Sequence, residues 1–165
     1  AIQKAIEENG FDEVLLIPGN VSLPTLNSKM TDVYEDTFES ANFKSGGSFA
    51  GAKSQNADKT RIVLVHKTQN LKDRPELKKT LNIKGQDVKL DQILTLEDYL
   101  VFQRKYFVET GKHLDEEGWA WLATMSGARL VLVYWYPGDG RVAVNAHDLD
   151  YRHDGLGARP SRSFF

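Results

Sequence analysis

Cysteine is absent from this chain of 165 residues, and its absence removes several kinds of chemistry at once. The protein cannot form disulfides, hold a metal through thiolates or use a cysteine nucleophile. Disulfides mark oxidising compartments, but their absence marks no compartment in particular.

Long apolar runs are also absent. A membrane-spanning helix needs roughly 20 mostly apolar residues in succession, and no such run occurs. We therefore expect no membrane insertion. The chain opens on Ala1 rather than Met, so we expect a processed protein or the C-terminal part of a longer one. Localisation stays unknown from the residues alone.

Neither sign of charge dominates. The chain has 21 basic and 23 acidic residues, a net charge of −2 at pH 7 and a pI near 6.1. This balance gives no long-range attraction to nucleic acid, so we expect no nucleic-acid partner. The length suits one domain, and we expect residues 1–165 to form it.

The region 126–165 lacks residue types that are frequent earlier. Lysine ends at Lys112, glutamate at Glu117, glutamine at Gln103 and methionine at Met125. What remains is mainly aliphatic, aromatic, Gly, Asp and Arg, and part of it alternates with a period of two. Such a period puts successive side chains on opposite faces of a strand.

The two predicted faces differ in character. One is apolar and fit for a core: Val131, Val133, Trp135, Val142, Val144 and Ala146. The other is mixed: Leu132, Tyr134, Tyr136, Ala143, Asn145 and His147. We expect the mixed face to be the surface on which this protein meets its ligand.

Tyrosines favour that interpretation, because the side chain combines a large apolar body with a hydroxyl group and is frequent at binding hot spots. Three are on or near this face: Tyr134, Tyr136 and Tyr151. The alternative is a second core layer beneath a loop at 39–60. Asn145, His147 and His153 argue against that alternative, since each would need hydrogen-bond partners in a dry layer.

Periodicity and capping residues predict the remaining elements. Helices are expected at 1–9, at 26–38, after Pro75 and from Thr95 to Gly111. Strands are expected at 14–17, 62–65, 119–123, 128–136, 141–146 and 158–164. Helices first and strands crowded last predict an α+β fold.

Acids and imidazoles cluster after the last alternating residue: His147, Asp148, Asp150, His153 and Asp154. The spacing matches neither a calcium loop nor a zinc pair. It favours a polar turn in which Asp side chains accept backbone N–H bonds and pair with Arg152. A small hydrolase remains an alternative, and it requires His147, Asp148 and His153 to converge in a pocket.

The tail Asp148–Phe165 (DLDYRHDGLGARPSRSFF) resembles the end of the variable proteins of diversity-generating retroelements. In that family a Gly-hydrophobe-Gly-x-Arg-Pro segment closes the domain after a stretch of substituted positions, and Gly155–Pro160 matches it here. Trp119–Ala123 (WAWLA), leading into Ala128–Val131 (ARLV), is similar to the central part of the family.

The resemblance implies a C-type lectin-like fold of the formylglycine-generating-enzyme branch, with antiparallel strands in the C-terminal half and helices before them. It also implies a variable region at about 130–157. The retroelement rewrites adenines, typically in Asn codons. Changing the adenines of such a codon can give codons for many residue types, but never for Lys, Glu, Gln, Met or Trp. The expected variable, ligand-binding positions are Leu132, Tyr134, Tyr136, Ala143, Asn145, His147, Tyr151, His153 and Gly155.

By resemblance, the protein is a non-enzymatic binding module whose ligand is a protein on another cell or particle. The resemblance also suggests that this protein is itself displayed on a cell or virion surface. Neither a cofactor, a metal nor a catalytic residue is expected. Formylglycine-generating enzymes work through cysteines, which are missing here. The calcium motifs of sugar-binding C-type lectins are missing too, although a calcium-dependent carbohydrate-binding lectin remains an alternative. The oligomeric state is unknown.

Overall fold

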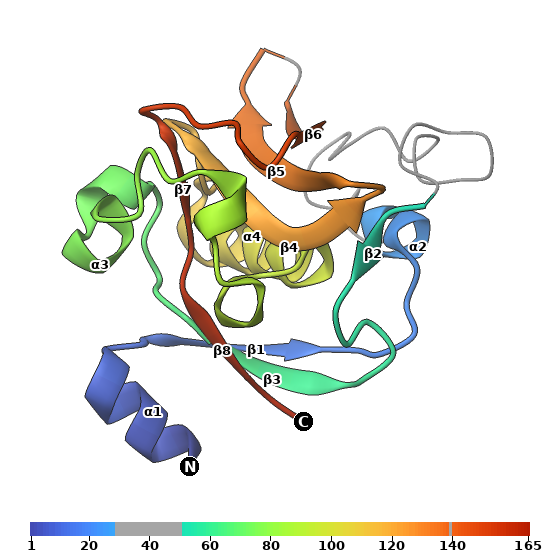
Figure 1. Ribbon diagram of the computed structural model, residues 1–165. Helices are drawn as coiled ribbons and strands as arrows, with labels where there is room; N and C mark the ends of the chain where they lie inside the picture. Colours follow the sequence, from blue (N-terminus) through green and yellow to red (C-terminus); the bar gives the residue numbers. More distant parts are fainter. Residues whose placement is uncertain (29–50, 139) are drawn as a thin grey trace.

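The computed structural model describes residues 1–28, 51–138 and 140–165 (Figure 1). Its helices are α1 (Ile2–Asn9), α2 (Leu23–Ser28), α3 (Pro75–Lys78) and α4 (Leu96–Thr110), with 3-10 turns η2 (Leu71–Asp73), η3 (Gly85–Asp87) and η4 (Leu90–Gln92). Its strands are β1 (Glu13–Ile17), β2 (Lys53–Ser54), β3 (Arg61–Val65), β4 (Trp119–Ser126), β5 (Arg129–Tyr136), β6 (Arg141–His147), β7 (Leu156–Ala158) and β8 (Ser161–Phe164).

The smaller sheet has the order β1-β3-β8 and is antiparallel throughout. It joins the beginning of the chain to its end. Leu15 and Ile17 point from β1 into the main core. On the other face Leu64 packs with Ala5 of α1 and with Phe11. The sheet therefore lies between α1 and the main core.

Helix α4 has Thr95, the predicted start, as its N-cap, and a capping box forms there. The Thr95 hydroxyl accepts a hydrogen bond from the Asp98 amide at 3.1 Å, and the Asp98 carboxylate accepts one from the Thr95 amide at 3.0 Å. The helix ends before Gly111, whose φ of 73° is in the left-handed region that favours glycine. Tyr99 and Phe102 are fully buried, so α4 contributes a broad face to the core.

The larger sheet has the order β2-β4-β5-β6, and β7 pairs with β4. The β4, β5 and β6 pairs are antiparallel, as the resemblance implies for the C-terminal half. The β4–β7 pair is the exception, because it is parallel. The expected closing strand at 158–164 is in fact two strands, one in each sheet, separated at Arg159 and Pro160. The chain thus ties both sheets together at its end (Figure 1).

The early part of the chain follows the predictions where it is described. Helix α1, strand β1 and strand β3 lie where they are expected. Helix α2 begins at Leu23, before the expected 26–38 helix, most of which is outside the described residues. The 39–60 loop is described only from residue 51, where it contains β2. No described helix is long and apolar enough to cross a membrane.

Candidate functional site

The register of β5 and β6 produces two faces of different character. Tyr134 lies opposite Ala143, and Leu132 opposite Asn145, so these residues share one face. The alternate residues of both strands enter the main core, together with α4 and the smaller sheet: Val131, Val133, Trp135 and Val142 are buried there, and Val144 and Ala146 pack against it. The alternation in the sequence therefore predicts correctly which side chains point inward.

The mixed face is covered at Leu132 by a second apolar layer. Leu132 is only 1% exposed and belongs to a cluster with Trp121 and Leu156. Side chains of the segment 83–93 pack against this cluster, and the Trp121 indole N–H donates to the Ile83 carbonyl at 3.0 Å. The expectation that Leu132 lies on the open surface is therefore wrong. Its cover comes from 83–93, a segment that no local pattern in 128–147 reveals.

The other predicted positions retain access to solvent. Tyr136 is 45% exposed, and Asn145 and His153 are also exposed. The remaining positions are partly buried: Tyr134, Ala143, His147, Tyr151 and Gly155. Gly155 has space for a side chain, because a Cβ there would meet the His153 ring at 3.5 Å, an ordinary contact.

Aromatic rings and imidazoles make a series of contacts across this open part. Tyr136 meets Tyr134 edge-on at 6.2 Å between centroids, and Tyr134 lies 5.8 Å from Trp119. Trp119 in turn lies 4.6 Å from the His153 ring. We call the open positions and Trp119 the ring-bearing surface: Trp119, Tyr134, Tyr136, Ala143, Asn145, His147, Tyr151, His153 and Gly155.

A second group of rings adjoins the first. His147 stacks on Tyr151 at 4.2 Å, with 15° between the planes. Tyr151 meets the buried Trp121 edge-on at 6.3 Å, which anchors the group to the second apolar layer. Trp119 is the residue that sequence reasoning missed, since it was expected only as the first residue of the strand at 119–123. Its alternation with the buried Ala120 is the signal that places it on the mixed face.

Three members of the acid and imidazole cluster, His147, Asp148 and His153, each contact a different residue. Arg129 pairs with Asp148 at 3.3 Å, so the predicted pairing of these acids with Arg152 is not what the structure shows. The His153 Nδ1 accepts a hydrogen bond from the Gly155 amide at 3.0 Å. The His147 ring is stacked on the Tyr151 ring. The convergence that a hydrolase requires is therefore not seen.

A shallow hollow of about 380 Å³ lies beside the stacked pair. Its lining combines guanidinium, carboxylate, imidazole and phenol groups: Arg129, His147, Asp148, Asp150, Tyr151 and Arg152. Among the residues that the structure describes, no three His, Asp or Glu side chains are grouped as metal ligands. The hollow therefore offers both hydrogen-bond donors and hydrogen-bond acceptors at the rim of the ring-bearing surface.

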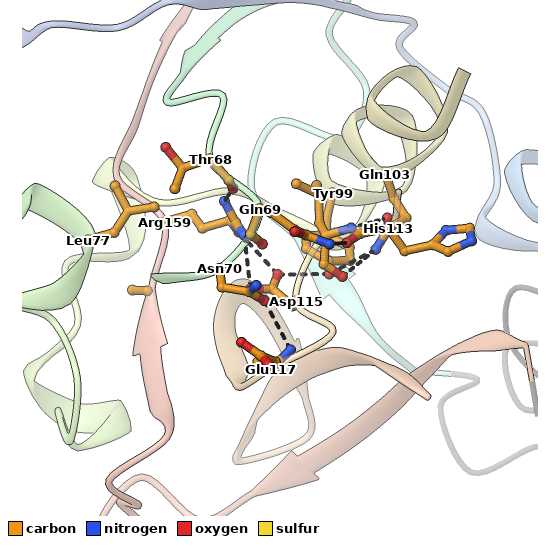
Figure 2. A network of polar contacts seen from close by, with 12 residues as sticks. Thr68, Gln69, Asn70, Leu77, Tyr99, Gln103, His113, Asp115, Glu117 and Arg159 are labelled. Atoms are coloured by element: carbon orange, nitrogen blue, oxygen red, sulfur yellow. Dashed lines mark hydrogen bonds and ion pairs between the residues drawn. The ribbon is translucent and has the colours of Figure 1, made fainter. Parts of the chain in front are cut away.

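A buried polar network fixes the segment that follows this surface (Figure 2). The Arg159 guanidinium is 2% exposed and donates to the Asp115 carboxylate at 2.9 and 3.1 Å. It also donates to the Thr68 and Gln69 carbonyls, each at 2.7 Å. Tyr99 donates from its hydroxyl to Asp115 at 2.9 Å. The Arg of the Gly-x-Gly-x-Arg-Pro segment thus holds the fold together.

Burial alone disfavours a charged guanidinium, but the adjacent Asp115 carboxylate outweighs it and raises the pKa of Arg159. The Arg159 guanidinium therefore stays charged at any ordinary pH. The ion pair connects the end of β7 to the turn before β4. The Asp115 carbonyl also accepts a hydrogen bond from the Trp135 amide of β5 at 3.1 Å. The network supports β5 from below its ring-bearing face.

His113 supports the same strand from the core side. Its ring stacks on Trp135 at 3.5 Å and on Phe107 at 4.3 Å. Burial lowers the pKa of His113 to about 4, so the ring is neutral at pH 7. A neutral ring in this position is compatible with an aromatic stack at the edge of the core, where Trp135 is buried and His113 is partly buried.

Two features therefore define the candidate site: a rigid sheet anchored by buried networks, and an open face on which aromatic, imidazole and amide groups gather. Comparison of the chain with protein families, with curated proteins and with solved structures finds no match.

Proposed function

We propose that this protein is a non-enzymatic binding module that presents the ring-bearing surface to a protein ligand. The observation that carries the proposal is the series of ring contacts from Tyr136 to His153 on the open part of an otherwise buried sheet. Partly exposed Tyr and Trp side chains supply large contact areas at low entropic cost and dominate binding hot spots.

The division of the sheet supports a surface that can change without loss of the fold. Val131 and Val133 are fully buried, and truncating such residues costs about 1–3 kcal/mol. Asn145 and Tyr136 point to solvent, where substitutions usually change stability by about 0.5 kcal/mol or less. The residues on the outward face can therefore vary in type while the inward residues maintain the structure.

We further propose that the scaffold is of the C-type lectin type and that the protein is a variable protein of a diversity-generating retroelement. The motif Gly155–Pro160 supports this assignment, and so does the alternation of β5 and β6. Under this proposal Leu132 is scaffold, because its burial leaves no room for arbitrary replacement. The ligand would then lie on another cell or particle.

The flanking DNA tests the family assignment. We expect a near-copy of the codons for about 130–165 beside a reverse transcriptase gene, differing only where the copy has adenine. Substitutions should fall at codons of the ring-bearing surface from Tyr134 to Gly155 and spare Leu132 and Trp119. A genomic neighbourhood without such a copy would contradict the assignment, although the binding function could still hold.

A displayed library tests the binding function. Codons for Tyr134, Tyr136, Asn145, Tyr151 and His153 are randomised on yeast-displayed protein, which is then selected against one purified test protein such as streptavidin. We expect most variants to remain folded and some to bind.

The matched control randomises five inward positions of the same strands: Val131, Val133, Trp135, Val142 and Val144. These variants should lose display and protease resistance. Equal loss in both libraries would refute the separation between scaffold and surface. A folded outer library that yields no binder would refute the recognition role.

A further inference from the structure

A second hollow, of about 550 Å³, shares no residue with the ring-bearing surface. Its volume is within the range of roughly 300–1,000 Å³ that is typical of ligand sites. Four parts of the chain supply most of its walls: Asn9 and Phe11 at the end of α1, Gln55 and Asn56 after β2, Leu90–Ile93 around η4, and Pro160–Ser163 with Phe165 around β8.

This hollow lies along the free edge of β8. Strand β8 is the outer strand of the smaller sheet as described, and it pairs with β3. Ser161, Arg162 and Ser163 all line the hollow. Because successive side chains point to opposite faces of a sheet, a space that touches three in a row must border the edge of the strand.

The backbone of this edge is available for pairing. Among the described residues, no partner outside β3 is found for the backbone groups of Ser161–Phe164. Just before β8, Pro160 forms an isolated bridge with Ile93, the residue that follows η4. Every second residue of a strand directs its N–H and C=O to the same edge, and an unpaired edge is a template for another strand.

The floor of the hollow carries charge that is already neutralised. Arg61 is buried and donates to the Asp98 carboxylate at 2.6 and 3.1 Å. Its other nitrogen donates to the Asn56 and Lys59 carbonyls. With the guanidinium fully engaged, the floor gives no preference to an anion.

The walls carry one exposed charge of each sign, from Arg162 and Asp91, so they favour neither an anionic nor a cationic chain. Exposed amides stand on two sides, from Gln55 and Gln92, and they can both donate to and accept from peptide groups. The Phe165 ring, 68% exposed, offers an apolar contact at one end. An open strand edge, flanking amides and an aromatic wall are the features of sites that add a peptide strand to a sheet.

We propose that this hollow binds an extended peptide segment of a partner protein, which pairs with β8 as a fourth strand of the smaller sheet. Main-chain hydrogen bonds to β8 would provide most of the affinity, and the side-chain contacts to Gln55, Gln92 and Phe165 would provide selectivity. The site is separate from the ring-bearing surface, so each proposal can fail without the other.

A random octapeptide library displayed on phage, selected against the whole chain, supplies the probe. Selected peptides are synthesised and added to ¹⁵N-labelled protein. We expect shifts and slowed amide exchange at residues 161–164. Methylating the peptide nitrogens that face β8 should weaken binding about tenfold or more, because each methyl removes a main-chain hydrogen bond. Methylating the intervening nitrogens should have little effect.

Matched variants locate the site. The double substitution Gln55→Ala, Gln92→Ala should weaken peptide binding, whereas Asn145→Ala on the ring-bearing surface should leave it unchanged. A library that yields no binder, binding insensitive to N-methylation, or binding lost only on Asn145→Ala would each overturn the proposal. Shifts at 161–164 caused by an oligosaccharide such as maltotetraose, with none from peptides, would overturn the peptide assignment.

Discussion

Replacing Leu132 by alanine tests where the scaffold ends and the display surface begins. Leu132 is on the same face of β5 as Tyr134, but it is 1% exposed and packs against Trp121, Leu130 and Leu156. Removing a buried leucine side chain costs about 2–5 kcal/mol, depending on how far the neighbours relax. For a domain of this size about 1 kcal/mol corresponds to roughly 2–4 °C in Tm, so the melting temperature should fall by about 6–12 °C for a loss near 3 kcal/mol.

The matched control is Asn145→Ala, at the cross-strand partner of Leu132. Its side chain is exposed, and its replacement should change stability by about 0.5 kcal/mol or less. Urea denaturation followed by tryptophan fluorescence and thermal melts followed by circular dichroism measure both variants. A Leu132→Ala protein as stable as Asn145→Ala would refute the second apolar layer and return Leu132 to the open surface.

Other substitutions address the buried networks. Asp115→Asn leaves the Arg159 charge without its carboxylate and should cost about 3–5 kcal/mol, measured by urea denaturation; a loss below 1 kcal/mol would contradict the assigned role. The folded-state pKa of His113, about 4, lies below its unfolded value of 6.5, so stability is complete above about pH 6.5 and falls as the pH drops toward 4. His113→Phe retains an aromatic ring and should flatten the stability profile between pH 6.5 and 4; a profile as steep as that of the parent would count against the burial of this ring. Thr95→Ala removes the N-cap of α4 and should cost about 0.5–2 kcal/mol, with faster amide exchange in its first turn, whereas unchanged exchange would show that the cap is dispensable.

Local sequence signals were enough to predict the elements that have clear capping residues or a clear period-two alternation. The Thr95–Asp98 box and Gly111 predicted both ends of α4, and the alternation of 131–147 predicted β5, β6 and the side chains that face the core. These predictions hold because capping and period-two patterning depend on neighbours in sequence. The closing segment was less predictable. It reads as one strand, yet Arg159 and Pro160 divide it between two sheets.

The open site was predictable only in part, and the difference has one physical cause. Alternation specifies which side chains share a face, and for β5 and β6 it did so correctly. It carries no information about what covers that face. Whether Leu132 is buried while Asn145 is open depends on where 83–93 packs, and whether Trp119 joins the rings depends on the β4–β5 pairing. Those contacts join residues far apart in sequence. The sequence by itself therefore determined the strands and the side chains that point inward. Only the tertiary structure decided which outward side chains remain open to a ligand.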